Sequence, residues 1–246
     1  MAYLESRKHV SPDSGYPVTL HPNFNAKINS WTPPDPPREE VTPPKDRALF
    51  ADPSKRALFS IADPIDLTES IGTLLENVQL SQLSPQQLDE LALLVAERGV
   101  VFFRDQDLTT EGQCRLFEHY GTLDTHPAQK DVKHVVIKGS QEDHREIAKY
   151  TPWPQGDWHA DTSFEINPPS YSMLRMEEHP IVDGDTAWIS QYGTFDALSP
   201  ALQRFVETLH AAYTSRLQYD TILDLWNVGP NRPQSTHTTP PCARTP

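Results

Sequence analysis

The chain has 246 residues, a hydrophobic content of 37% and a formal charge of −13 at pH 7. This acidity, without any run of Lys or Arg, excludes a nucleic-acid partner, because binding a phosphate backbone requires clustered cations. No apolar stretch approaches the roughly 20 residues of a membrane span, and the N-terminus lacks the pattern of a secretory signal. The two cysteines make no disulfide framework. We therefore predict a cytoplasmic protein without a membrane partner.

Residues 1–59 are predicted to form a Pro-rich N-terminal arm that is partly disordered. Eleven of the 24 prolines lie before residue 65. Within the arm, Arg47–Phe50 has the same sequence as Arg56–Phe59. Two copies of four residues are too few and too short for a repeat fold. We interpret them as two turns by which the arm docks on a folded domain that begins at residue 60.

A well-marked helix is predicted to follow the arm. Ser84 is a good N-cap, Pro85 suits the first turn, and Gln87 stands at the capping-box position. Apolar residues then recur at helical spacing until Gly99, which ends the helix. Residues 99–103 read as a buried strand, and a second helix is expected over residues 110–120.

The second half of the chain is predicted to contain strands. Their expected positions are residues 134–138, 170–176 and 186–190. The polar stretch 139–157 is long and irregular, which is typical of a functional or mobile loop. A further helix is expected to begin at Ser199, with apolar residues on one face. Residues 229–246 are rich in Pro and Thr and are expected to form an irregular tail.

The most informative feature of the sequence is the pair His159 and Asp161. In an extended segment, side chains two residues apart point to the same side. An imidazole and a carboxylate so placed are two of the three ligands in the facial arrangement that binds Fe(II). Chance alone gives about 1.4 such triplets in a chain of this composition, and the second one, His144 with Glu146, lies in a polar stretch that we interpret as a solvated loop. From the residues alone, a half-buried His159 hydrogen-bonded to Asp161 remains an alternative.

Several motifs give the pair its context. The segment Trp158–Phe164 reads W-H-x-D-x-x-F, residues 167–169 read N-P-P, and Gly184–Trp188 reads G-D-T-A-W. Three further motifs precede them, namely residues 99–106, residues 117–121 and the dipeptide His126–Pro127. In this order and spacing the motifs resemble the taurine dioxygenase (TauD/TfdA) family of Fe(II)- and 2-oxoglutarate-dependent dioxygenases, and in particular its fungal-type sulfonate dioxygenases with a Pro-rich leader.

The resemblance implies a fold that is mainly β with flanking helices, an α+β double-stranded β-helix (jelly roll, cupin-like), over residues 60–228. It implies Fe(II) as cofactor, with His159 and Asp161 as metal ligands, and 2-oxoglutarate as co-substrate, hydrogen-bonded by Thr186. It further implies that His126 lines the substrate pocket. Each of these two residues also has a purely structural alternative. Thr186 would be a strand residue whose hydroxyl is hydrogen-bonded within the protein, and His126 would be a turn residue that precedes a proline.

The activity implied is hydroxylation of a small organic acid by O2, with a sulfonate such as taurine releasing sulfite. The family's second His ligand and its Arg for 2-oxoglutarate lie far later in the chain than the first motif, and we expect both to be absent from a jelly roll that is incomplete at its C-terminus. His237 and Arg244 have suitable residue types, but lie too close to His159. Two other readings therefore stay open: a catalytically inactive remnant that acts at most as a binding protein, and a cupin-like protein with another metal. The sequence leaves homo-oligomer formation open.

Overall fold

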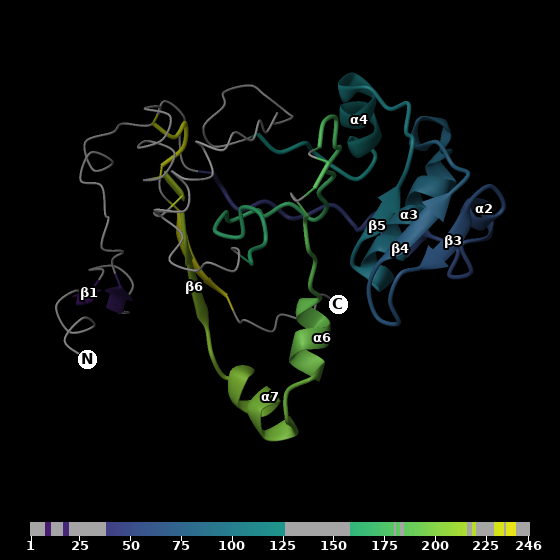
Figure 1. Cartoon of the computed structure of the whole chain (residues 1–246). Coiled ribbons are helices and arrows are strands. Elements are labelled where there is room, and N and C mark those ends of the chain that lie inside the picture. Colours follow the sequence, from purple (N-terminus) through teal and green to yellow (C-terminus); the bar gives the residue numbers. More distant parts are fainter. Residues whose placement is uncertain are drawn as a thin grey trace. The chain divides into compact units, whose positions relative to one another are not determined.

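The computed structural model describes residues 8–10, 17–19, 38–125, 158–179, 181–182, 185–215, 218–219, 229–233 and 235–239 (Figure 1). The chain divides into two compact units, which we treat separately. The first unit comprises Met1–Glu40, Thr125–Pro168 and Ala212–Thr238, and the second comprises Val41–Asp124, Pro169–Ala211 and Thr239–Pro246. Among the described residues, no helix has the length and apolar character needed to cross a membrane.

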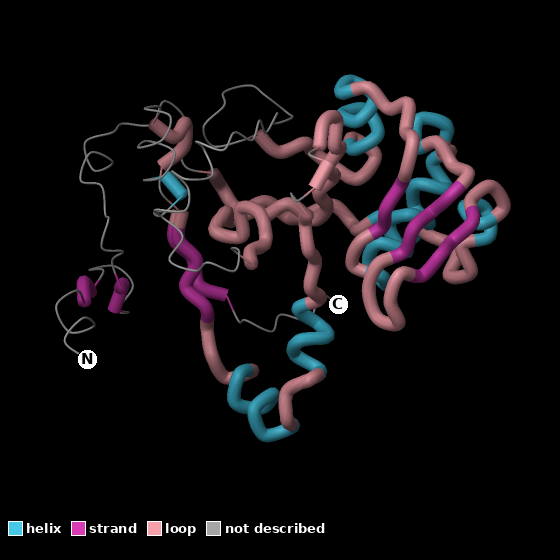
Figure 2. The backbone as a smooth tube through the Cα atoms, in the orientation of Figure 1, coloured by secondary structure: helices cyan, strands magenta, loops and turns pink. Residues whose placement is uncertain are grey.

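The second unit is built around a three-stranded sheet, which Figure 2 shows in magenta beside cyan helices. Strand β4 (Thr73–Glu76) lies in the centre, antiparallel to β3 (Asp63–Asp66) and parallel to β5 (Val101–Phe103). A parallel pair cannot be joined by a tight turn. The 3₁₀ helix η3 (Leu80–Gln82) and helix α3 (Pro85–Arg98) therefore form the crossover between β4 and β5.

Helix α3 begins and ends as its sequence predicts. The Ser84 side chain accepts a hydrogen bond from the Gln87 backbone N–H, and the Gln87 side chain accepts one from the Ser84 N–H at 2.9 Å. Gly99 follows the helix with φ +71°, a conformation that favours glycine. Leu88, Leu91 and Leu94 are buried along the helix. Local capping and helical periodicity are thus enough to define this element.

Both copies of the Arg-Ala-Leu-Phe sequence pack on α3. The first forms the 3₁₀ helix η2 (Arg47–Phe50) and the second forms helix α2 (Arg56–Phe59). Leu58 of α2 is completely buried, and its N–H donates to the carboxylate of Glu90 at 2.6 Å. The domain boundary at residue 59 stays a prediction, but the core already includes Leu58.

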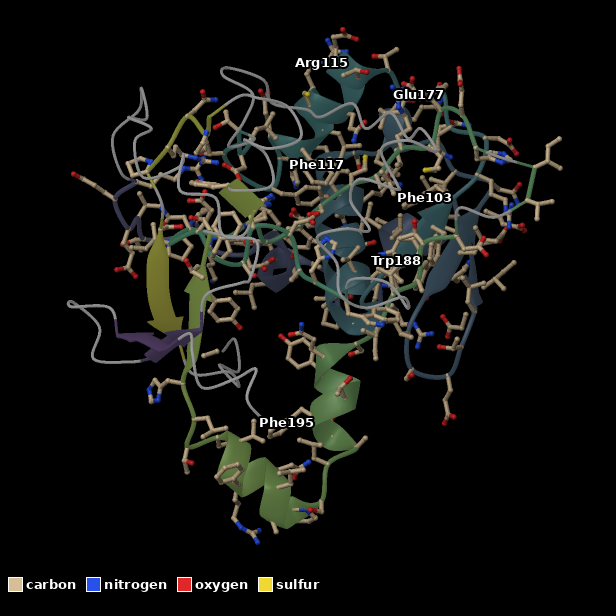
Figure 3. All side chains as sticks on the ribbon, turned by 60° about the vertical axis from the view of Figure 1, so that its left-hand side comes forward. Phe103, Arg115, Phe117, Glu177, Trp188 and Phe195 are labelled. Atoms are coloured by element: carbon tan, nitrogen blue, oxygen red, sulfur yellow. The ribbon has the colours of Figure 1, made fainter. Side chains whose placement is uncertain are left out.

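The core of the second unit is a cluster of aliphatic side chains between α3, the sheet and helix α4 (Thr110–Phe117). Helix α4 begins at its cap Thr109, and it is shorter than the predicted 110–120 because the chain continues as turns after Phe117. Figure 3 labels Arg115 and Phe117 on this helix. The buried members of the cluster are Leu58, Ala62, Leu75, Val78, Leu80, Leu88, Leu91, Leu94, Leu108 and Leu116.

Tyr120 packs against this core and should make the stability of the fold depend on pH. The Tyr120 hydroxyl donates to the Leu88 carbonyl at 3.2 Å, and its ring lies 5.3 Å from that of Tyr171. Burial, with a smaller contribution from the negative charge of Asp89, raises the pKa of Tyr120. The folded state therefore holds this proton more tightly than the unfolded state, in which the pKa is about 10.

We expect the free energy of unfolding to keep its full contribution from Tyr120 below about pH 10 and to lose up to about 1.4 kcal/mol per pH unit above it. Tyr120→Phe removes the ionisable group, so its alkaline decline should be shallower. Urea unfolding between pH 8 and pH 11.5 measures this, with Tyr192→Phe, at a 65% exposed position, as the control. Parallel pH profiles for wild type and Tyr120→Phe would contradict the expectation.

The predicted strands 170–176 and 186–190 are irregular in the structure, so both predictions are wrong (Figure 2). Alternation of apolar residues indicates faces, but a strand also needs a neighbouring strand to pair its backbone groups. Side chains near α4 hold the first segment instead. The Met173 carbonyl accepts from Gln113 at 3.2 Å, and Arg175 donates to the Leu108 carbonyl and to the Thr110 hydroxyl.

The second segment is anchored by one aromatic contact. The ring of Trp188 meets Phe102 of β5 edge to face, with centroids 5.1 Å apart, and Figure 3 labels this tryptophan. Helix α6 (Gln191–Asp196), which the sequence did not predict, follows at its cap Ser190. Helix α7 (Pro200–Val206) begins at Ser199 as predicted, but two of its large apolar residues are exposed, Leu202 at 43% and Phe205 at 58%. The predicted strand 134–138 and loop 139–157 lie outside the described residues.

The first unit contains two small sheets and a core of buried aromatic and polar side chains. Strand β1 (Lys8–Val10) pairs antiparallel with β2 (Pro17–Thr19), and β6 (Ala211–Thr214) pairs with β7 (Thr236–Thr239). Figure 1 labels β6. After β6 the chain enters a core in which the ring of Phe164 packs edge to face on Tyr219, which is completely buried.

Candidate metal centre

The structure brings the two predicted metal ligands together. The Nε2 atom of His159 lies 3.1 Å from the Oδ1 atom of Asp161. Both side chains are mostly exposed, His159 at 61% and Asp161 at 67%. A ligand in solution can therefore reach both groups.

The local conformation differs from the extended segment that the spacing predicts. Residues 158–160 are irregular, and a turn begins at Asp161. Thr162 has φ +45°, in the left-handed region, and the Glu165 N–H donates to the Thr162 carbonyl at 2.9 Å. A bend directly after Asp161 thus sets the direction in which this carboxylate points.

The donor atoms of the pair fit a divalent metal ion. Imidazole nitrogen and carboxylate oxygen are the ligands of the facial Fe(II) site. Such atoms stand about 2.0–2.2 Å from a divalent ion such as Zn²⁺, so two of them at a right angle are about 3.0 Å apart. The 3.1 Å between His159 Nε2 and Asp161 Oδ1 is close to this separation. One ion could therefore replace the hydrogen bond that now joins them.

The other predicted site residues are distributed over the chain. Thr186 belongs to the second unit, in an irregular and exposed stretch next to the Trp188 anchor. His126 lies outside the described residues. His237 falls within strand β7, where the sequence had predicted an irregular tail, and Arg244 lies outside the described part. Over the described ranges there is no group of three or more His, Cys, Asp or Glu side chains that could hold a metal ion.

Sequence reasoning missed two buried, oppositely charged residues of the first unit. Glu165 and Arg232 are buried in the first unit, with 3% and 6% of their surface exposed, and they form an ion pair at 3.3 Å. A charged residue four positions after Asp161 could have been noted, but the sequence contains no signal that links it to an Arg so much later in the chain.

Comparison with known proteins defines the class of fold. A protein of Burkholderia xenovorans, provisionally assigned as an alpha-ketoglutarate-dependent taurine dioxygenase, has a similar structure with a TM-score of 0.51 and 23% identity, over 73% of this chain and 59% of that one. This likeness confirms the predicted fold class, a jelly roll with flanking helices.

Residues 65–246 match the model of the "taurine catabolism dioxygenase TauD, TfdA family". The chain therefore belongs to this family, whose members use Fe(II) and 2-oxoglutarate, as the motifs around His159 predicted. It is 32% identical to an alpha-ketoglutarate-dependent sulfonate dioxygenase of Saccharomyces cerevisiae, over 88% of this chain and 57% of the relative. It is 36% identical to an alpha-ketoglutarate-dependent dioxygenase of Penicillium expansum, over 67% of this chain and 47% of the relative. The chain thus spans about half the length of these relatives.

Proposed function

We propose that the chain contributes to an Fe(II)- and 2-oxoglutarate-dependent dioxygenase site that hydroxylates a small organic acid. The observation that carries the proposal is the pair His159 and Asp161, 3.1 Å apart and open to solvent, within the motif that the family shares. Both donor types suit Fe(II) and leave other positions on the ion for the co-substrate and O2.

The family motifs propose a role for each predicted residue. His159 and Asp161 hold the metal ion through one imidazole nitrogen and one carboxylate oxygen. Thr186 donates a hydrogen bond to a carboxylate of 2-oxoglutarate, and its exposure leaves the hydroxyl accessible. His126, which lies outside the described residues, is proposed from its motif to bind the substrate. These roles follow from the family motifs and from the donor chemistry of each side chain.

Bound Fe(II) supplies the activation of O2, one atom of which enters succinate as 2-oxoglutarate loses CO2 while the other enters the substrate as a hydroxyl group. The protein's share is to hold 2-oxoglutarate and the substrate beside the metal ion on the His159–Asp161 pair. Thr186 suits this role because its hydroxyl carries one O–H donor, which can bind one carboxylate oxygen of 2-oxoglutarate.

A sulfonate is the substrate class that we favour. The Saccharomyces cerevisiae relative is a sulfonate dioxygenase. Hydroxylation of the carbon that bears a sulfonate gives an unstable product, which releases sulfite as its C–S bond breaks and an aldehyde forms. Taurine is the simplest compound with which to test this class.

The test is succinate formation by the purified 246-residue chain with Fe(II), 2-oxoglutarate, O2 and taurine. We expect succinate and sulfite in equal amounts, and neither with the double variant His159→Ala/Asp161→Ala. Succinate without sulfite would support the oxygenase but not the substrate. Metal binding by wild type without any succinate would favour the alternative, a catalytically inactive member of the family that acts as a binding protein.

A further inference from the structure

The turn that carries Asp161 continues directly into the buried ion pair of the first unit. Arg232 approaches Glu165 with its Nη2 atom at 3.3 Å from Oε1, and the same nitrogen donates to the Thr125 carbonyl at 2.8 Å. The Arg232 side chain is 8% exposed and that of Glu165 is 4% exposed. We call these two residues the Glu165–Arg232 pair.

Stability alone is a poor explanation for the Glu165–Arg232 pair. Moving two charges out of water costs several kcal/mol for each ion, and packed apolar side chains of similar volume often stabilise a protein as well or better. What this pair supplies in addition is a fixed place for the planar guanidinium group, because Arg232 donates to the Thr125 carbonyl while the Glu165 carboxylate meets it as a charge contact at 3.3 Å. A buried charged pair of which one member lies four residues after a candidate metal ligand therefore points to a role in geometry.

Backbone contacts connect this pair to the metal ligands. The N–H of Glu165 closes the turn after Asp161 by donating to the Thr162 carbonyl at 2.9 Å. The neighbouring Phe164 carbonyl accepts a hydrogen bond from the Ser235 hydroxyl at 2.9 Å. The turn is therefore fixed at its C-terminal end by its own hydrogen bond and by Ser235, three residues after Arg232.

The same region is itself well fixed. The backbone N–H of Ser235 donates to the Ser215 hydroxyl at 3.0 Å, and the Ser215 N–H donates back to the Ser235 carbonyl at 3.1 Å. Ser215 is completely buried. The ring of Phe164 packs on Tyr219 with centroids 5.9 Å apart. A rotation of the Asp161 turn would therefore have to break hydrogen bonds and packing in the first unit's core.

We propose that Glu165 and Arg232 are positioning residues that hold the Asp161 turn so that the carboxylate of Asp161 and the imidazole of His159 face one ion. This inference rests on the proposed function, since it concerns the same metal ligands. Neither residue contacts the ion. Both act through the turn at Thr162, whose left-handed backbone conformation needs support from its surroundings.

The experiment compares Arg232→Met with wild type in the full chain, using Mn(II) as the probe and the NMR signals of the His159 imidazole as a second readout without metal. Loss of an orienting partner near metal ligands lowers metal affinity by about 10- to 100-fold. We expect a loss in this range for Arg232→Met and for Glu165→Gln, together with shifted His159 signals. The double variant Glu165→Gln/Arg232→Met should lose less affinity than the sum of the two single losses.

Arg98→Met is the matched control, because Arg98 is also largely buried, at 15%, and donates to the Thr68 and Gly72 carbonyls of the second unit. It should lower stability and leave Mn(II) affinity unchanged.

Unchanged His159 signals in Arg232→Met would overturn the inference, whether or not Mn(II) binds. A failure of the proposed function looks different: wild type and His159→Ala would then bind Mn(II) equally. If Arg232→Met does not fold, Arg232→Lys, which keeps the charge but not the planar group, should show a smaller loss of affinity, and no loss would contradict the role.

Discussion

Replacing His159 or Asp161 by Ala is expected to lower the affinity of the chain for Fe(II) or Mn(II) by about 100-fold or more. Partners that only orient a ligand already account for about 10- to 100-fold in metal affinity, so removing a ligand should cost at least as much. Because both side chains are mostly exposed, neither substitution leaves a cavity or a buried charge. The folded state should therefore keep its stability while metal binding is lost.

The measurement is an anaerobic titration with Mn(II), followed by electron paramagnetic resonance of the free ion, with thermal unfolding of the same samples. The matched control is His144→Ala/Glu146→Ala, which removes the second His-x-acid triplet of the sequence. This control should bind the ion as wild type does. Equal affinity in wild type and in Asp161→Ala would contradict the assignment of the metal centre.

Replacing Asp89 by Asn is expected to lower the free energy of unfolding by about 3 kcal/mol, the largest effect on stability that we predict. Both carboxylate oxygens of Asp89 accept from the Arg47 guanidinium at 2.7 Å, and one also lies 2.6 Å from His119 Nε2. Asp89 is 7% exposed. The change leaves the charge of Arg47 without its partner and removes the link between η2, α3 and the end of α4.

Urea unfolding measures this loss, and limited proteolysis with trypsin adds a local readout, because cleavage at Arg47 should become faster. Asp52→Asn is the matched control. Asp52 also pairs with an Arg of an adjacent turn, Arg56, at 2.7 Å, but the Arg56 side chain is 83% exposed. Exposed pairs contribute little. A similar response of the two variants would contradict the special weight that we give to the Asp89 network.

Much of the local structure could be predicted from the sequence, because it depends on neighbouring residues. Ser84, Pro85 and Gln87 define the start of α3, and Gly99 defines its end. The proximity of His159 and Asp161 likewise follows from their separation by one residue. The family was also evident from ordered motifs, and the comparisons confirmed it. Each of these predictions needs only a few consecutive residues, or their order along the chain.

The tertiary structure decided everything that joins residues distant in the chain. Segments 170–176 and 186–190 have the residue pattern of strands, but in the described structure side-chain contacts to α4 and to Phe102 hold them instead. The partners Arg47 and Asp89, and Glu165 and Arg232, carry no local signal. The physical reason is that a strand or a buried charge is stable only where another part of the chain supplies its hydrogen bonds. The sequence by itself therefore determined the capped helix and the candidate ligands, and tertiary contacts determined what supports them.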